Sequence, residues 1–118
     1  VLSAPVGPTI LRASAAKTYG PATIYAEPSI TSDKTFAAEI LQLPAGTQVP
    51  EHVHAGETEL LYILAGAGTM TVAGTNLAVT PTSVVQIPPN TKHSFTASAA
   101  VKALQIYTPA GPEQRFKK

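Results

Sequence analysis

From Lys34 onward, the chain is a series of short apolar or alternating segments separated by turn-forming residues. Most segments are four to nine residues long, and Pro, Gly, Asn or Thr bounds each of them. Strands, rather than amphipathic helices, have this length and these boundaries. The pattern predicts strands at 35–43, 48–53, 58–65, 68–72, 76–79, 83–87, 93–96 and 101–108. A series of this kind is typical of an all-β sandwich or barrel.

The turns between these segments favour an antiparallel arrangement. Residues 73–76 read Ala-Gly-Thr-Asn and are expected to close a hairpin between two strands of a meander. Pro88 and Pro89 cannot donate backbone hydrogen bonds, so the chain must form a rigid loop there. Pro109 ends the last predicted strand for the same reason.

The 118 residues are interpreted as one domain with three parts. Residues 34–109 form the predicted β-barrel. Residues 1–33 hold four of the eleven prolines and are expected to be an irregular N-terminal arm with one short edge strand at 23–26 and at most a turn or two of helix at 13–19. For the tail, residues 110–118, fraying is the default expectation, and capping the barrel or docking on a partner is the alternative.

Composition excludes several classes of function. The net charge is +1, and the basic residues are scattered except at the tail, so neither nucleic acid nor a membrane surface is an expected partner. The longest apolar run, 60–65, is too short to span a bilayer. Without cysteine there is no disulfide, thiol catalysis or cysteine-ligated metal. The chain starts at Val1 without a signal-peptide pattern, which leaves a cytoplasmic and a processed, exported form both open.

The three histidines stand where they could share one site. His52 and His54 are two apart on a predicted strand, so both imidazoles face the same way. A turn at 55–58 is expected to bring the next strand back beside the first, with Glu59 at its start. Two imidazoles and a carboxylate suit a divalent transition metal and leave coordination positions open. His93 follows the double-proline loop and could add a third imidazole.

Each of these features also has an ordinary explanation. A His-x-His pair on a strand is more often solvent-facing or satisfied in a core, and His93 alone would be a surface histidine. Glu51, Glu57 and Glu59 could form a hydrated acidic loop. Placement favours the metal site, because three of the seven acidic residues lie within nine positions of the histidine pair.

The same residues resemble a known pattern. Gly46, five residues, His52-Val-His54, four residues, Glu59, six residues and Gly66 reproduce the spacing of the first signature motif of the cupin superfamily. The resemblance covers about residues 34–109 and identifies the chain as similar to a small single-domain monocupin.

The second cupin motif is matched less closely. Pro88 and His93 are in register with it. Thr82 and Asn90 stand where the motif has glycines, and Ala97 stands where it has asparagine. Asparagine tolerates a left-handed turn better than other non-glycine residues, so Asn90 is a mild departure.

The resemblance implies a small antiparallel jelly-roll β-barrel with one metal ion in its mouth. The implied ligands are His52, His54, Glu59 and His93. Glu57 is the rival carboxylate, but the family's shorter spacing would need an acid at the position of Thr58. These ligands do not distinguish iron, manganese, nickel, copper, cobalt and zinc, so the cofactor is predicted only as one divalent transition metal per chain.

Three further residues are candidates for substrate binding. Phe95 shares a predicted strand face with His93, and Gln105 shares one with Tyr107. All three could line a pocket beside the metal. The competing interpretation is that Phe95 and Tyr107 are core aromatics.

Together these observations favour a metal-dependent enzyme that acts on a small molecule by dioxygenase-like or Lewis-acid chemistry. One alternative is a non-catalytic module of the same fold that binds a metal or small ligand, and another is a metal that only stabilises the fold. Exposed strand edges and low surface charge also predict a homodimer.

Overall fold

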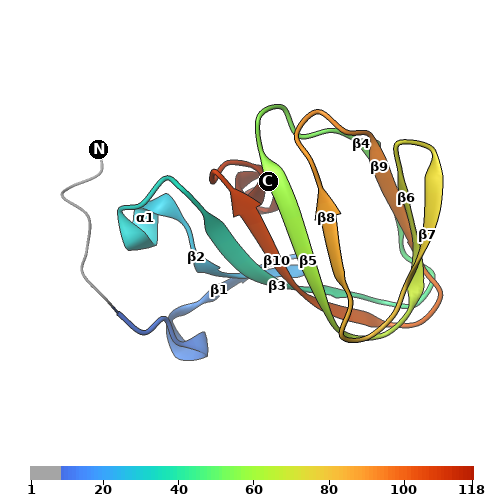
Figure 1. Ribbon diagram of the computed structural model, residues 1–118. Coiled ribbons are helices and arrows are strands. Elements are labelled where there is room, and N and C mark those ends of the chain that lie inside the picture. The colour runs from blue at the N-terminus through green and yellow to red at the C-terminus, as the bar shows by residue number, and fades with distance from the viewer. Residues whose placement is uncertain (1–8) are drawn as a thin grey trace.

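The computed structural model describes residues 9–118, whose ten strands form two antiparallel sheets facing one another (Figure 1). The six-stranded sheet contains, in spatial order, β1 (Lys17–Tyr19), β2 (Ala22–Ala26), β3 (Ala37–Leu43), β10 (Val101–Thr108), β5 (Thr58–Ala65) and β8 (Val84–Ile87). The four-stranded sheet contains β4 (Gln48–His52), β9 (His93–Ala97), β6 (Gly68–Val72) and β7 (Thr75–Val79). This arrangement confirms the predicted all-β, jelly-roll fold class, although the two sheets do not close into a continuous barrel.

The helical elements are short: η1 (Ala13–Ala15), α1 (Pro28–Thr31) and η2 (Pro112–Lys117). Within residues 9–118, no helix has the length and apolar character needed to cross a membrane.

The eight strands predicted from residue 34 onward are all present as β3–β10, with ends within two residues of the predicted ones. The hairpin between β6 and β7 turns at Ala73 and Gly74, which both have positive φ, and Val72 pairs with Thr75. Two consecutive residues of positive φ match the right-handed twist of the flanking strands, which explains why the predicted hairpin forms.

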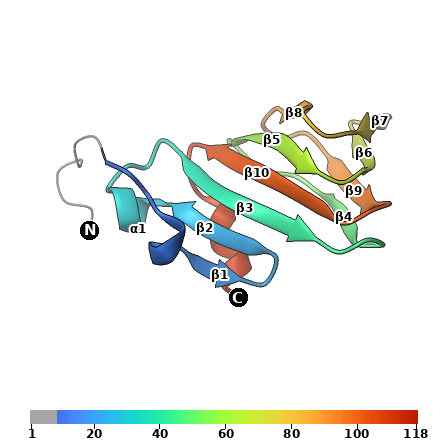
Figure 2. The ribbon, with the colours of Figure 1, turned by 90° about the horizontal axis from the view of Figure 1, so that it is seen from below.

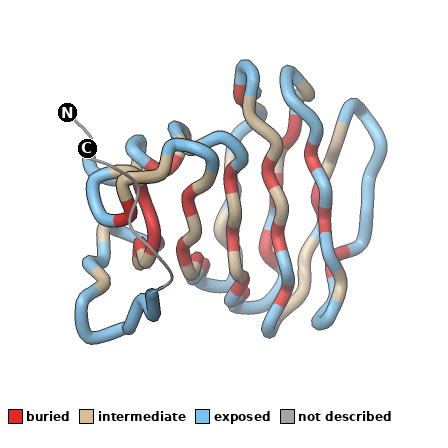
Figure 3. Tube along the Cα trace, turned by 60° about the vertical axis from the view of Figure 1, so that its left-hand side comes forward, coloured by how far each residue is buried: buried red, intermediate tan, exposed pale blue. Residues whose placement is uncertain are grey.

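The core lies between the two sheets and is built by alternation along the strands. On β5, Glu59, Leu61 and Ile63 are buried while Tyr62 and Leu64 are exposed, so one face of the strand points inward. Buried and exposed segments alternate in the same way along the neighbouring strands (Figure 3). Glu59 therefore lies on the inward face of β5, at the edge of the apolar interior.

The N-terminal region contains more regular structure than the sequence predicted. β1 and β2 form a hairpin, and β2 lies between β1 and β3, with Ala22 and Ile24 almost fully buried. The strand predicted at 23–26 is present as β2, but its predicted edge position was wrong, because β1 takes the edge of the sheet. Residues 1–8 of the predicted arm lie outside the described residues.

The expectation of a frayed C-terminal tail was also wrong. Residues 112–117 form η2, which is docked near the end of β2 (Figure 2). Glu27 accepts hydrogen bonds from Gln114 Nε2 at 2.7 Å and from Lys117 Nζ at 2.6 Å. Phe116 packs against the core, and Glu113 is buried. Apolar burial and a partly buried ion pair thus hold the segment against the sheet.

Candidate metal centre

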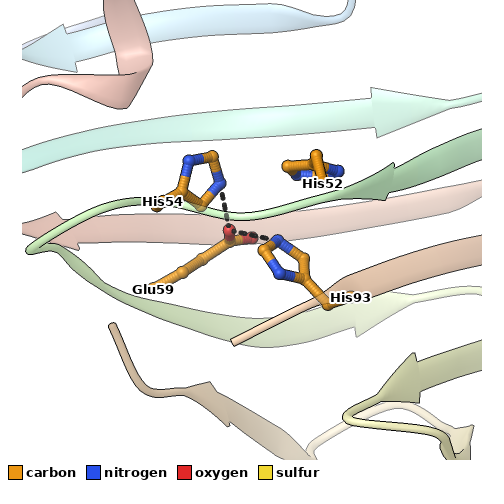
Figure 4. A group of neighbouring side chains, drawn as sticks. All are labelled: His52, His54, Glu59 and His93. Carbon is orange, nitrogen blue, oxygen red and sulfur yellow. Dashed lines mark ion pairs between the residues drawn. The ribbon is translucent and has the colours of Figure 1, made fainter. Parts of the chain in front are cut away.

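Four predicted ligands come together from both sheets (Figure 4). His52 ends β4 and pairs in register with His93, the first residue of β9. His54 follows two residues later, and Glu59 is the second residue of β5. The sequence predicted that the strands carrying His52 and Glu59 run side by side, which was wrong: β4 and β5 belong to different sheets. Glu59 meets the imidazoles across the interior because residues 53–57 cross from one sheet to the other.

The side chains are close enough to share one ion. Each can contribute one ligand atom, and these four atoms lie within 4.8 Å of one another. His54 Nε2 is 3.2 Å from Glu59 Oε1, and His93 Nε2 is 3.4 Å from the same oxygen. Glu57, the rival carboxylate, is not part of this group.

Backbone carbonyls fix the orientation of two imidazoles. His52 Nδ1 lies 2.8 Å from the carbonyl oxygen of Pro50, and His93 Nδ1 lies 2.9 Å from that of Thr91. A carbonyl oxygen can only accept, so each Nδ1 carries a proton, and in its neutral form each imidazole presents a lone pair at Nε2. Contacts of this kind commonly orient the histidines of metal sites.

Glu59 is held in a similar way. Gln105 Nε2 donates a hydrogen bond to its Oε2 at 2.8 Å, which leaves Oε1 directed toward the imidazoles. Burial alone would raise the pKa of Glu59, but the adjacent imidazoles of His54 and His93 and the Gln105 hydrogen bond lower this pKa to about 2. The carboxylate is therefore ionised at neutral pH. Burial lowers the pKa of His52, which favours its neutral form.

The free atoms of this cluster fit a metal ion. Within the described residues, His52 Nε2, His54 Nε2, His93 Nε2 and Glu59 Oε1 are buried without a hydrogen-bond partner. Buried polar atoms are rarely left unpaired, so four such atoms converging on one point need an explanation. Three imidazole nitrogens and one carboxylate oxygen are a donor set that divalent transition metals accept. The residues present could therefore hold one.

An apolar pocket adjoins the cluster. His52, Glu59 and His93 line its polar end, and the rest of the wall is largely aliphatic and aromatic, including Leu61 and Phe95. Gln105 also lines it. The structure thus places two of the three predicted substrate-binding residues, Phe95 and Gln105, in the pocket wall. Phe95 belongs to the hydrophobic core as well, in agreement with the competing interpretation.

Tyr107 does not line this pocket. It is fully buried, and its ring packs edge-on against His54 with 5.3 Å between the ring centroids. Burial, reinforced by the nearby negative charge of Glu59, raises the pKa of Tyr107, so its hydroxyl stays protonated. Tyr107 therefore supports the imidazole of His54 and is unsuited to act as a base.

Two charged residues near the site were not predicted. Arg115, in η2, lines the pocket, and no sequence signal for it was recognised because the tail was expected to fray. Glu39, on β3, is fully buried with both carboxylate oxygens unpaired, and burial raises its pKa to about 8. The alternation of β3 could have revealed Glu39, since it shares the inward face of Leu41 and Leu43.

The backbone accounts for two of the three departures from the second motif, those at Thr82 and Asn90. Thr82 has φ 68° and Asn90 has φ 59°, so both adopt the left-handed conformation that glycine most readily provides. The chain keeps the turn geometry of the motif without its glycines.

Solved structures resemble this fold over most of their length. KdgF from Halomonas sp. has 14% sequence identity and a TM-score of 0.76, with 92% of this chain and 99% of that chain covered. The nucleoside dehydratase Pac13 from Streptomyces has 15% identity and a TM-score of 0.74, with 92% and 88% covered. A predicted oxalate decarboxylase from Thermotoga maritima has 19% identity and a TM-score of 0.70, with 86% and 100% covered.

A search of curated protein sequences finds no match. The Cupin domain family, in contrast, matches residues 39–107, a span that runs from β3 to β10 and includes all four residues of the candidate metal centre. With the jelly-roll fold and the two motifs, this match shows that the chain belongs to the cupin domain family.

Proposed function

We propose that the protein binds one divalent transition metal through His52, His54, Glu59 and His93 and acts on a small organic molecule held in the adjoining pocket. The observation that carries this proposal is the convergence of four buried donor atoms, none with a hydrogen-bond partner, at the polar end of an apolar pocket. When bound, such an ion supplies Lewis-acid or redox chemistry to a ligand in its remaining coordination positions. Two structural neighbours, the nucleoside dehydratase and the predicted oxalate decarboxylase, are named as enzymes, which supports a catalytic role.

The chain's own residues have distinct roles in this proposal. The carbonyl groups of Pro50 and Thr91 hold two imidazoles with Nε2 facing the ion. Gln105 orients the carboxylate of Glu59. The apolar pocket wall excludes water from the substrate and strengthens electrostatic interactions inside.

The test separates an enzyme from a binding module. Small molecules would be screened for thermal stabilisation of the metal-loaded protein, and each one that binds would be assayed for chemical conversion. We expect conversion by the wild-type protein and by Glu57→Ala, and none by Glu59→Ala, which lacks a metal ligand. Circular dichroism would establish that Glu59→Ala is folded.

The outcomes have different meanings. Ligands that bind tightly and remain chemically intact would support the non-catalytic module instead. Conversion that persists in a metal-free Glu59→Ala protein would contradict the proposed chemistry.

A further inference from the structure

Arg115 places a positive charge at the mouth of the pocket. It lines the apolar pocket together with His52, Glu59 and His93. It also lines two neighbouring surface depressions, both of which include His52. The Arg115 side chain therefore stands where three depressions meet, beside the candidate metal centre.

The position of Arg115 is fixed by its neighbours in η2. On one side, Gln114 donates a hydrogen bond to Glu27. On the other, Phe116 packs against the core and Lys117 forms an ion pair with Glu27 at 2.6 Å. Anchors on both sides limit the movement of the backbone that carries the guanidinium.

The charge of Arg115 is not neutralised by an ion pair among the described residues. Among residues 9–118, its guanidinium forms no ion pair, and it lies over the ring of Phe116, 4.8 Å from the centroid. Lys117, in contrast, is neutralised by Glu27. The guanidinium remains free to pair with an anion outside the chain.

The field of Arg115 extends into the site. Burial raises the pKa of Glu39, and the charge of Arg115 opposes that rise. Arg115 also lines the pocket together with His52 and Glu59, so its charge lies beside the candidate metal centre.

The charges of the candidate metal centre and of Arg115 indicate which class of ligand the pocket binds. Three neutral imidazoles and one carboxylate around a divalent ion leave a net charge of +1, and Arg115 adds a second positive charge nearby. A carboxylate on the ligand would balance this charge, and its two oxygens match the fork of a guanidinium. The apolar wall beyond, including Leu61 and Phe95, suits the uncharged part of the same molecule.

We propose that Arg115 binds the carboxylate of the ligand, so that the substrates of this site are small organic acids whose apolar part enters the pocket. This inference rests on the proposed function for the location of the ligand. It adds the chemical class of the substrate and a specificity-determining residue in the C-terminal segment.

The test compares acids with their uncharged amides. Binding of propanoate and propanamide, and of 2-methylpropanoate and 2-methylpropanamide, whose apolar parts are short enough for the small pocket, would be measured by calorimetry with the wild type, Arg115→Gln and Lys118→Gln. Lys118 is the matched control, because it lines one of the same depressions without lining the pocket. We expect Arg115→Gln to weaken binding of an acid about tenfold, as loss of a charged hydrogen bond does, and to leave amide binding unchanged. Lys118→Gln should change neither by more than about twofold.

Acids that bind no better than their amides, or an Arg115→Gln protein that binds acids like the wild type, would overturn the inference. The metal content of Arg115→Gln should equal that of the wild type. Repeating the titrations on metal-stripped protein separates the two proposals. If the metal-stripped protein prefers acids over amides and loses this preference in Arg115→Gln, this inference holds even if metal binding fails. If no such preference is found with or without metal, this inference is overturned.

Discussion

Gln105 on β10 donates a hydrogen bond from Nε2 to Oε2 of Glu59 on β5, over 2.8 Å in the protein interior. The two strands are adjacent, and Gln105 pairs in register with Leu61, two residues along from Glu59. The sheet itself therefore sets the direction of the Glu59 carboxylate, and the remaining oxygen faces His54 and His93.

This relationship predicts that Gln105→Leu weakens metal binding although Gln105 is not a ligand. Without the hydrogen bond, Glu59 loses its fixed orientation, and we expect a loss of metal affinity of about 10- to 100-fold, as for other residues that support metal ligands. Competition with a chelator of known affinity measures the change. Gln86→Leu, the same substitution at an exposed position of β8, is the control and should bind metal like the wild type. Equal affinities for the two variants would contradict the role of Gln105.

Glu39 makes stability fall as pH rises. Its pKa is raised to about 8, so between about pH 4.5 and 8 the folded chain keeps a proton that the unfolded chain releases. The free energy of unfolding therefore decreases across this window, by at most about 1.4 kcal/mol per pH unit. Relative to wild type, Glu39→Gln should gain about 4 kcal/mol of stability between pH 4.5 and 8. Urea unfolding in the presence of EDTA measures this, and a difference independent of pH would be inconsistent with a buried, neutral Glu39.

Glu27 affects the pH dependence of stability in the opposite direction to Glu39. Burial alone would raise its pKa, but the hydrogen bonds from Lys117 and Gln114 lower it below the usual value. Its ionised form stabilises the fold at and above pH 4.5, and this contribution is lost as pH falls through the lowered pKa. We expect Glu27→Gln to reduce the free energy of unfolding by about 1 to 3 kcal/mol at pH 7 and by less at pH 3. The same unfolding series provides the measurement, and a variant as stable as the wild type at pH 7 would show that this pair does not hold η2.

The two glycines that flank the first motif should respond differently to substitution. A Cβ at Gly66 would lie 2.1 Å from the carbonyl oxygen of Ala100 and 2.7 Å from Cα of Val101, whereas one at Gly46 would meet nothing within 4 Å. Both have positive φ, so alanine is strained at either by about 1 to 2 kcal/mol. Only the Gly66→Ala substitution must also displace the neighbouring backbone of Ala100 and Val101. We expect this variant to lose more than about 4 kcal/mol of its free energy of unfolding, or to fail to fold. Thermal unfolding of the two variants tests this, and similar losses would refute the steric argument.

The strands from β3 to β10 could be predicted because each alternates in hydrophobicity and ends at a residue that breaks the ladder. Alternation identifies the inward face of a strand but not its neighbours. This is why β5 was expected beside β4, while the structure pairs it with β8 and β10. The hairpin of β1 and β2 was missed because a three-residue strand such as 17–19 has too little alternation to recognise.

The four residues of the candidate centre could be predicted because their spacing reproduces a family motif. The role of Arg115 could not be predicted, because its position depends on the contacts that hold η2 against Glu27. These contacts come from Gln114 and Lys117, which are 87 and 90 residues from Glu27 in the chain. The homodimer and the dioxygenase-like chemistry stay predictions.

The central claim is tested most directly by the metal content of the protein purified without chelator or metal-affinity resin. Mass spectrometry should find about one equivalent of a divalent transition metal in the wild type and in Glu57→Ala, and almost none in His52→Ala or Glu59→Ala. A wild-type protein that holds no metal even after reconstitution, or folded His52→Ala and Glu59→Ala proteins that retain a full equivalent, would contradict the account.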